Sequence, residues 1–223
     1  MTAAAMTFSD LPETIRRPLT IGEVAAIADV DRKVVNRMVD DGVLPRSVLV
    51  SRRARGDARA RRFVKASGIP MVLLVATTGG FISKELRKTA FAVIERMIRE
   101  NITTGVVEAG ALTLDLSTVM SDALARMIAL ARAEEDVESD PDVRGGAPVM
   151  RGTRILAHEL ASLAEIDSVE AILEGYPGLT QDRIENATIY AKAHPLNGRP
   201  RKRSALPQGA RIVSASKIDL GAL

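Results

Sequence analysis

The strongest constraint on the fold is a change of hydrophobic period between Pro148 and Pro195. The residues leading into this stretch, Gly-Gly-Ala-Pro-Val-Met-Arg-Gly-Thr-Arg-Ile, are rich in turn-forming types. Three runs with apolar residues at helical spacing follow: Leu160–Ala164, Val169–Leu173 and Ile184–Ala191. Turn and capping residues separate them, including Asp167-Ser168 and Tyr176-Pro177-Gly178. The pattern predicts three short helices with short connections, a compact helix-turn-helix unit.

This stretch also resembles a known family. The order Arg-Gly-Thr-Arg-Ile, a short helix, Ser-Val-Glu-Ala-Ile-Leu-Glu-Gly-Tyr-Pro-Gly-Leu-Thr and a helix ending near Tyr-Ala-Lys-Ala-His-Pro resembles the bacterial domain of unknown function four-three-three. That domain often occurs in antitoxins whose partner is a PIN-type nuclease toxin. With a second helix-turn-helix in front of it, the chain looks like a VapB-type antitoxin. The resemblance implies a protein that inhibits a PIN-type ribonuclease and represses its own operon by binding double-stranded operator DNA.

Composition fits an ordinary soluble protein. In 223 residues, 26% charged and 46% hydrophobic, there is room for one large or two small domains. No apolar run approaches the ~20 residues that span a bilayer, so no membrane partner is expected. The N-terminus lacks the apolar core of a signal peptide, which favours a cytoplasmic location. With no Cys and only two His, we expect no metal and no cofactor.

Positive charge is concentrated at the two ends of the chain. Residues 1–65 hold 13 basic and 8 acidic side chains, a balance of +5, and residues 196–223 hold 6 and 1, again +5. Residues 66–150 hold 8 and 12, a balance of −4, and residues 151–195 hold 4 and 7, a balance of −3. A polyanion should therefore meet the ends and not the middle.

The N-terminal part carries a helix-turn-helix pattern. Thr20 with Glu23 is a capping-box signature, which predicts a helix from Ile21 to about Ala28. Asp31 can cap a second helix that ends near Asp40, with Gly42 as its stop. The predicted interior residues are Val24, Ile27, Val34, Val35, Met38 and Val39. The predicted DNA-contacting residues, on the outer side of the second helix, are Arg32, Lys33, Asn36 and Arg37. Residues 20–45 also resemble the start of MerR-like winged helix-turn-helix domains, although Asp40 and Asp41 would oppose phosphate.

A basic run follows. Between Ser51 and Lys65 there are seven basic residues and one acid. We interpret it as a wing in which Phe63 and Val64 anchor a strand and arginines reach phosphates or a minor groove. The predicted contacts are Arg52, Arg53, Arg55, Arg59, Arg61 and Arg62. The alternative is a solvated charge run.

The middle of the chain reads as scaffold. Residues 69–75 fit either a buried strand or a helix, and the MerR-like resemblance favours the helix. Helices are predicted from Ser83 to about Arg99 and from Ser117 to Glu135, with a β-hairpin turning at Ala109-Gly110 between them. The acids of residues 115–142 lack the spacing of a calcium loop, and no phosphate loop or nucleophile elbow is present. We therefore expect no catalytic residue and no enzyme activity.

The C-terminal helix-turn-helix is acidic, which favours protein contacts, chiefly self-association, over DNA contact through Arg151 or Arg154. His158 and His194 are expected at the surface or as helix caps, and Tyr176 and Tyr190 in the core.

The basic tail lacks a periodic apolar face and is expected to be disordered alone. The antitoxin resemblance implies that an arginine of the tail enters the carboxylate cluster that holds magnesium in a PIN-type nuclease. An apolar pair could add an edge strand to that partner. The predicted toxin-binding residues are Arg199, Arg201, Arg203, Arg211, Ile212 and Val213. Deleting residues 196–223 should then abolish neutralisation and spare operator binding.

These readings combine into a mainly α protein with two helix-turn-helix domains, the first winged, joined by helices and a small β-hairpin. The expected parts are a flexible arm (1–18), a MerR-like winged helix-turn-helix (19–100), a hairpin and connecting helix (101–142), the C-terminal helix-turn-helix domain (143–195) and the basic tail (196–223). A homodimer is expected because two half-sites match two-fold symmetry. The alternatives are a stand-alone MerR-like transcriptional regulator and an adaptor that binds only proteins.

Overall fold

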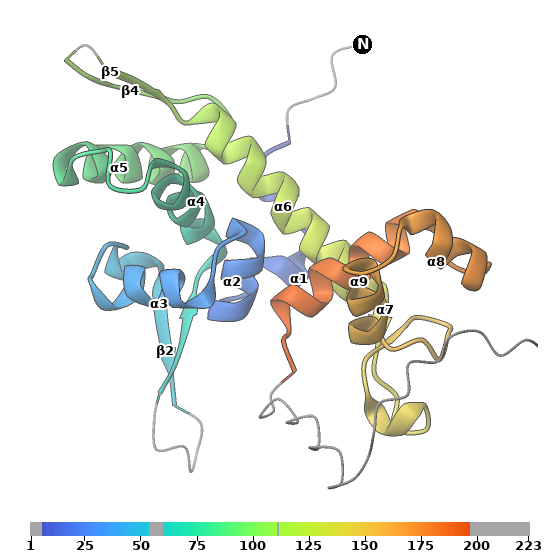
Figure 1. Ribbon diagram of the computed structural model, residues 1–223. Helices are drawn as coiled ribbons and strands as arrows, with labels where there is room; N and C mark the ends of the chain where they lie inside the picture. Colours follow the sequence, from blue (N-terminus) through green and yellow to red (C-terminus); the bar gives the residue numbers. More distant parts are fainter. Residues whose placement is uncertain (1–5, 54–59, 111, 197–223) are drawn as a thin grey trace, which may run out of the picture.

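The computed structural model describes residues 6–53, 60–110 and 112–196, and in this part of the chain helices dominate over three small antiparallel sheets. Figure 1 shows a body of helices from which the β2–β3 and β4–β5 hairpins project in different directions, with α7, α8 and α9 grouped at one end of the long helix α6. The mainly helical character expected from the sequence is confirmed.

The N-terminal segment of residues 8–16 packs against the core. The turn η1 (Phe8–Asp10) and α1 (Glu13–Arg16) place Leu11 and Ile15 in the core, where they are 1% and 0% exposed. The Arg16 guanidinium donates to the Leu11 carbonyl at 2.7 Å and to the Ser9 carbonyl at 2.9 Å. The flexible arm expected over residues 1–18 is thus wrong for residues 6–18, because two apolar side chains with helical spacing anchor it.

Helices α2 (Ile21–Ala28) and α3 (Arg32–Asp40) form where the capping residues predict them. Thr20 and Glu23 make a reciprocal capping box on α2, and the Asp31 side chain accepts from the Lys33 amide at the start of α3. Asp29 joins the two helices in the left-handed conformation, with φ 52°. One interior assignment is wrong: Val34 is 38% exposed, because α3 turns only Val35 and Met38 fully inward.

A three-stranded sheet follows, in the order β1 (Leu19–Thr20), β3 (Arg61–Val64), β2 (Leu49–Arg52). A turn, η2 (Arg46–Val48), leads into β2. Leu49 pairs with Val64 and Arg52 with Arg61, so the predicted wing is a β-hairpin anchored by the fully buried Val64. Residues 54–59, which come between these two strands in the sequence, lie outside the described residues.

Residues 69–75, for which the sequence allowed either a strand or a helix, are helical. After η3 (Ala66–Gly68), α4 spans Ile69–Thr78, and the MerR-like resemblance predicted this correctly. Ser83 caps α5 (Lys84–Glu100), and the hairpin of β4 (Val106–Ala109) and β5 (Leu112–Asp115) leads into α6 (Ser117–Glu135). The bounds of these elements lie within a residue or two of those predicted from the sequence.

The C-terminal unit begins before the predicted boundary at residue 143. Strand β6 (Val137–Glu138) pairs with β7 (Val149–Met150), with η4 (Arg144–Gly146) between them. Helices α7 (Ala157–Ala164), α8 (Val169–Gly175) and α9 (Gln181–Ala193) follow. Val137 and Met150 pack with Leu160, Ile172 and Ile184 in a second core. Tyr190 packs against this core, but Tyr176 is 40% exposed, so its core assignment is wrong.

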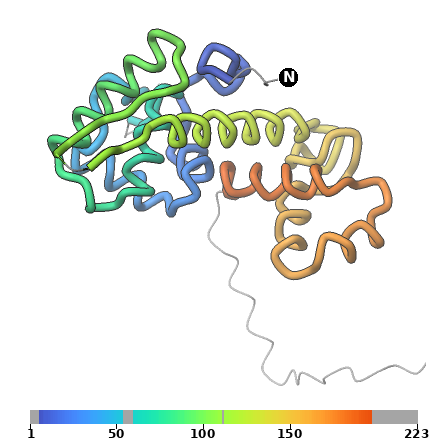
Figure 2. Tube along the Cα trace, turned by 90° about the horizontal axis from the view of Figure 1, so that it is seen from above, coloured from blue at the N-terminus to red at the C-terminus, as the bar shows by residue number. Residues whose placement is uncertain are grey.

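Helix α9 joins the two cores. Ile184 and Ala187 belong to the second core, whereas Ala193, 2% exposed, belongs to the first. Figures 1 and 2 both show α9 alongside the long helix α6. The end of α9 therefore sits against α2 and fixes the C-terminal unit relative to the N-terminal one. Across the described residues, no helix combines the length and apolarity needed to cross a membrane.

Candidate nucleic-acid interface

Helix α3 presents a row of basic side chains to solvent. Arg32, Lys33 and Arg37 are all exposed, while Val35 and Met38 hold the opposite face of the helix in the core. In the described part of the chain no carboxylate lies within ion-pairing distance of these three basic groups. Uncompensated cations on an exposed helix are suited to contact phosphates.

The other predicted residue of α3, Asn36, is occupied within the protein. Its Oδ1 accepts from Arg62 Nη2 at 2.8 Å, and its Nδ2 donates to the Arg32 carbonyl at 3.0 Å. The same Arg62 guanidinium also bonds the Asp40 carboxylate. Arg62 therefore links the wing to α3 and neutralises one of the two acids that opposed DNA contact at the end of this helix.

The remaining wing residues divide into three groups. The Arg52 guanidinium lies 5.8 Å from the Phe63 ring centroid, a cation–π distance that holds it along the hairpin. Arg53 and Arg61 are exposed and also interact within the chain. Arg55 and Arg59 lie outside the described residues, as do all six toxin-binding predictions: Arg199, Arg201, Arg203, Arg211, Ile212 and Val213.

A cleft of 620 Å³ separates this surface from the C-terminal unit. Arg32, Arg61 and Arg62 line one side of it, and His158 and Tyr190 line the other. Pro195 and Leu196, the last described residues, also line it. Among the described residues that form this lining there is no carboxylate, so the cleft continues the basic surface of α3 and the wing.

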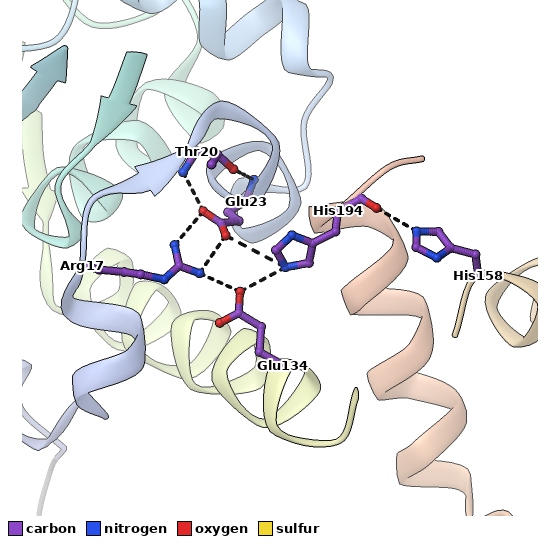
Figure 3. Close-up of polar contacts among 6 residues, drawn as sticks. All are labelled: Arg17, Thr20, Glu23, Glu134, His158 and His194. Carbon is purple, nitrogen blue, oxygen red and sulfur yellow. Dashed lines mark hydrogen bonds and ion pairs between the residues drawn. The ribbon is translucent and has the colours of Figure 1, made fainter. Parts of the chain in front are cut away.

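Beside the cleft, a polar junction of Arg17, Glu23, Glu134 and His194 binds the units together (Figure 3). Arg17 donates to both oxygens of Glu23, at 3.0 and 2.7 Å, and to Glu134 Oε1 at 2.8 Å. His194 Nε2 lies 3.0 Å from the same Glu134 oxygen. The residues come from the N-terminal segment, α2, α6 and the end of α9, so four distant parts of the sequence meet here.

The buried polar atoms of the junction have hydrogen-bond partners. The Thr20 amide donates to Glu23 Oε2 at 2.6 Å, and His158 Nε2 lies 2.7 Å from the His194 carbonyl oxygen, where it caps the end of α9. The capping role expected for a histidine is therefore confirmed for His158. Within the described ranges no buried side-chain nitrogen or oxygen lacks a partner.

Burial and hydrogen bonding oppose each other at Glu23, which is 2% exposed. Burial raises the pKa of its carboxyl, but bonds from Arg17 and from the Thr20 amide outweigh it, and the net pKa is lowered. The same contact with Glu23 raises the pKa of Arg17. At Tyr190, burial and then the charge of Glu134 raise the pKa of the phenol.

Ligand atoms of Glu23, Glu134 and His194 lie within 4.8 Å of one another, a spacing that a metal ion could use. The Arg17 guanidinium already bonds both carboxylates and supplies the positive charge that a cation would bring. The arrangement therefore acts chemically as an ion-pair clamp between helices.

Most of this junction is not apparent from the sequence. The sequence patterns identify Glu23 as a capping residue and His194 as a surface or capping residue, but assign nothing to Arg17 or Glu134. The one available signal was the capping box, because a Glu fixed at that position of an apolar helix requires a cation if the helix is buried.

The chain resembles other proteins over most of its length. Residues 137–191 match the family described as Protein of unknown function (DUF433). Over 213 residues the chain is 33% identical to the "Uncharacterized protein y4eO" of Sinorhizobium fredii (strain NBRC 101917 / NGR234), which covers 90% of this chain and 92% of that protein. No solved structure matches the chain.

Proposed function

Since this chain belongs to the family of the rhizobial protein y4eO, with a DUF433 domain at residues 137–191, we propose that it is a DNA-binding regulator of the antitoxin type. Its α2–α3 pair and β2–β3 hairpin act as a MerR-like winged helix-turn-helix on operator DNA. A partner nuclease of the PIN type is its second target. Neither the matched family nor the rhizobial relative carries an assigned activity, so the proposal depends on geometry and on the resemblance to VapB-type antitoxins.

The exposed α3, with the wing linked to it, is the observation that carries the proposal. An α-helix with its side chains is about 10 to 12 Å across, which fits a major groove about 12 Å wide. Arg32 and Lys33 lie at its first turn, from which recognition helices contact bases, and Arg37 lies one turn further along. The link from Arg62 to Asn36 and Asp40 sets the hairpin beside this helix.

Salt-dependent binding tests the DNA contact. The probe is a duplex covering the region upstream of the gene, compared with a scrambled duplex of equal length. Lys33→Gln with Arg37→Gln should make the plot of log K against log [salt] shallower by about 1.8, because each phosphate that is no longer neutralised removes about 0.9 from the slope. The matched control, Lys88→Gln with Arg96→Gln on exposed positions of α5, removes the same charge and should leave the slope unchanged. An equal change in both double variants would show that α3 is not the contact.

The nuclease contact is assigned to the tail, on the resemblance and on its sequence. Where a PIN-type nuclease is encoded beside this gene, the test is its cleavage of RNA with and without the full chain. Arg211→Gln in the full chain should weaken the inhibition, because a carboxylate cluster in the nuclease would lose its counter-charge. Full cleavage in the presence of the unaltered chain would leave the stand-alone regulator as the function.

A homodimer completes the proposal, with self-association through the C-terminal unit. Two exposed apolar side chains there support it, Ile166 at 81% and Tyr176 at 40% exposure. Mass measurement by light scattering should give a dimer for the chain and a monomer for Ile166→Ser. A dimer that is unaffected by this substitution would place the contact elsewhere.

A further inference from the structure

The cleft between the two units has walls of different chemistry. Its volume of 620 Å³ is in the range of sites that bind small organic molecules. On the N-terminal wall lie three side chains that carry guanidinium groups, Arg32, Arg61 and Arg62. On the C-terminal wall lie the rings of His158 and Tyr190, both half-buried. A ligand that spans the cleft therefore meets cations on one side and aromatic rings on the other.

The N-terminal wall favours an anion. Among the described residues, no carboxylate lines the cleft and none forms an ion pair with Arg32. Arg62 is bonded to Asp40, but its side chain is still 40% exposed. A cleft lined by one sign of charge concentrates its electric field on a ligand of the opposite sign. Guanidinium groups recognise phosphate in particular, through paired and charge-assisted hydrogen bonds.

The two walls are held at a fixed separation by the packing of α9 on α2. A Cβ on Gly22 would lie 3.8 Å from Arg32 Nε and 2.7 Å from the Ala193 carbonyl oxygen. The Arg32 side chain and the end of α9 thus approach the same glycine at the start of α2. The next residue of the chain, His194, has its Nε2 3.0 Å from Glu134 Oε1. The cleft is therefore already formed before a ligand enters, which lowers the cost of binding.

The C-terminal wall favours a flat ring. The ring centroid of Tyr190 lies 5.9 Å from that of His158 and 4.6 Å from that of His194. All three side chains line the cleft. Aromatic side chains bind flat heterocycles by stacking, and a nucleic-acid base is such a heterocycle.

We propose that the cleft binds a small phosphorylated ligand with an aromatic ring, of the size and chemistry of a nucleoside monophosphate. Its phosphate lies against Arg32 and Arg62, and its ring lies against Tyr190 and His158. Binding of this ligand does not require DNA, so the site goes beyond the proposed function.

The first experiment measures, by isothermal titration calorimetry, the binding of AMP, ribose 5-phosphate and adenosine to the full chain. AMP should bind at one site per chain. Ribose 5-phosphate lacks the ring and adenosine lacks the charge, so each should bind about tenfold more weakly or worse, because one wall of the cleft then has nothing to recognise. Equal affinity for AMP and either of the other two probes would overturn the proposal.

The second experiment locates the site with matched variants. Arg32→Gln removes a cation from the cleft and should weaken AMP binding about tenfold. Lys33→Gln removes the same charge from the next position of α3, which is not among the described lining residues, and should leave AMP affinity unchanged. Both positions are exposed, so both variants should keep the fold. In NMR spectra, AMP should shift the ring signals of Tyr190 and leave those of Tyr176, outside this lining, in place.

Three further results would also count against the site. One is the absence of saturable AMP binding to the full chain. Another is an equal loss of affinity in Arg32→Gln and Lys33→Gln, which would show that AMP responds only to the net charge of the α3 surface. The last is a Tyr190 spectrum that bound AMP leaves unchanged, which would place the ligand elsewhere. None of these measurements contains DNA, so failure of the ligand site is distinguishable from failure of the proposed function.

Discussion

The polar junction and the α3 surface use the same types of residue in opposite ways. At the junction, Arg17 is bonded both to Glu23 and to Glu134 of α6, and Glu23 is 2% exposed. On α3, Lys33 and Arg37 are exposed, and in the part of the chain that the structure describes no carboxylate forms an ion pair with either charged group. The first arrangement fixes helices to one another, and the second is available to a partner.

The contrast shows that position in the fold, not local composition, decides what a charge does. Arg16-Arg17 and Arg32-Lys33 are similar basic pairs in the sequence. One pair bonds inward to carbonyls and carboxylates, because the apolar Leu11 and Ile15 draw its segment onto the core. The other follows a helix cap and lies on the exposed outer side of α3. Four tests break or sharpen this comparison.

The largest effect is expected from Glu23→Gln. The substitution keeps an oxygen for the Thr20 amide but removes the charge that pairs with Arg17. Breaking a buried ion pair costs about 3 to 5 kcal/mol, and we expect about 3 kcal/mol because Arg17 is 40% exposed. Chemical denaturation measures the loss. Glu159→Gln, at an exposed position of α7, is the matched control and should change stability by less than about 0.5 kcal/mol.

Lowering the pH should remove most of the difference in unfolding free energy between the parent chain and Glu23→Gln. The pKa of Glu23 is lowered from its ordinary value of 4.5, so its charge stabilises the fold at neutral pH and the contribution is lost as pH falls through the lowered pKa. The gap in unfolding free energy between the parent and Glu23→Gln should therefore narrow progressively below pH 4.5. A gap of constant size from neutral pH down to well below that value would mean that shape, and not charge, is what the substitution disturbs.

A steric change at the same place should have a smaller effect. A Cβ on Gly22 would lie 2.7 Å from the Ala193 carbonyl oxygen, so Gly22→Ala forces α9 away from α2. Overpacking of this kind costs about 2 kcal/mol. Hydrogen exchange should show faster opening of α9 amides, together with a lower denaturation midpoint. Gly175→Ala, where nothing described lies within 4 Å of the added carbon, is the control, and equal losses in both variants would argue against a tight α2–α9 contact.

The sequence predicted local features better than long-range ones. The starts of α2, α3 and α5 follow from Thr20, Asp31 and Ser83, because a cap acts within three residues of itself. The extent of α5 and the β4–β5 turn also depend on local signals, and both were predicted. Val34 was placed wrongly, because periodicity on a helix of two and a half turns does not fix how far its buried face extends.

The junction could not have been predicted, because its members are far apart in the sequence. Arg17 and Glu134 are 117 positions apart, and Glu134 and His194 are 60 apart. From the sequence alone, each would be expected to be a surface charge. Only the packing of α9 against α2 and α6 brings them together. The same packing brings Leu196 to the basic cleft, so the sequence could not show that this residue lies in one cleft with Arg32.

The smallest effect, and the sharpest test of the contrast, concerns Arg62, which has features of both regions. It is 40% exposed, like the cations of α3, but it is bonded to Asp40 and Asn36, like those of the junction. An exposed pair of this kind contributes under about 1 kcal/mol, so Arg62→Gln should barely lower the denaturation midpoint. DNA affinity should fall a few-fold, because the Asp40 charge is no longer neutralised beside a phosphate. If Arg62 acts through Asp40, adding Asp40→Asn should restore most of the affinity. If the double variant binds as weakly as Arg62→Gln alone, Arg62 contacts DNA directly and belongs with the α3 surface.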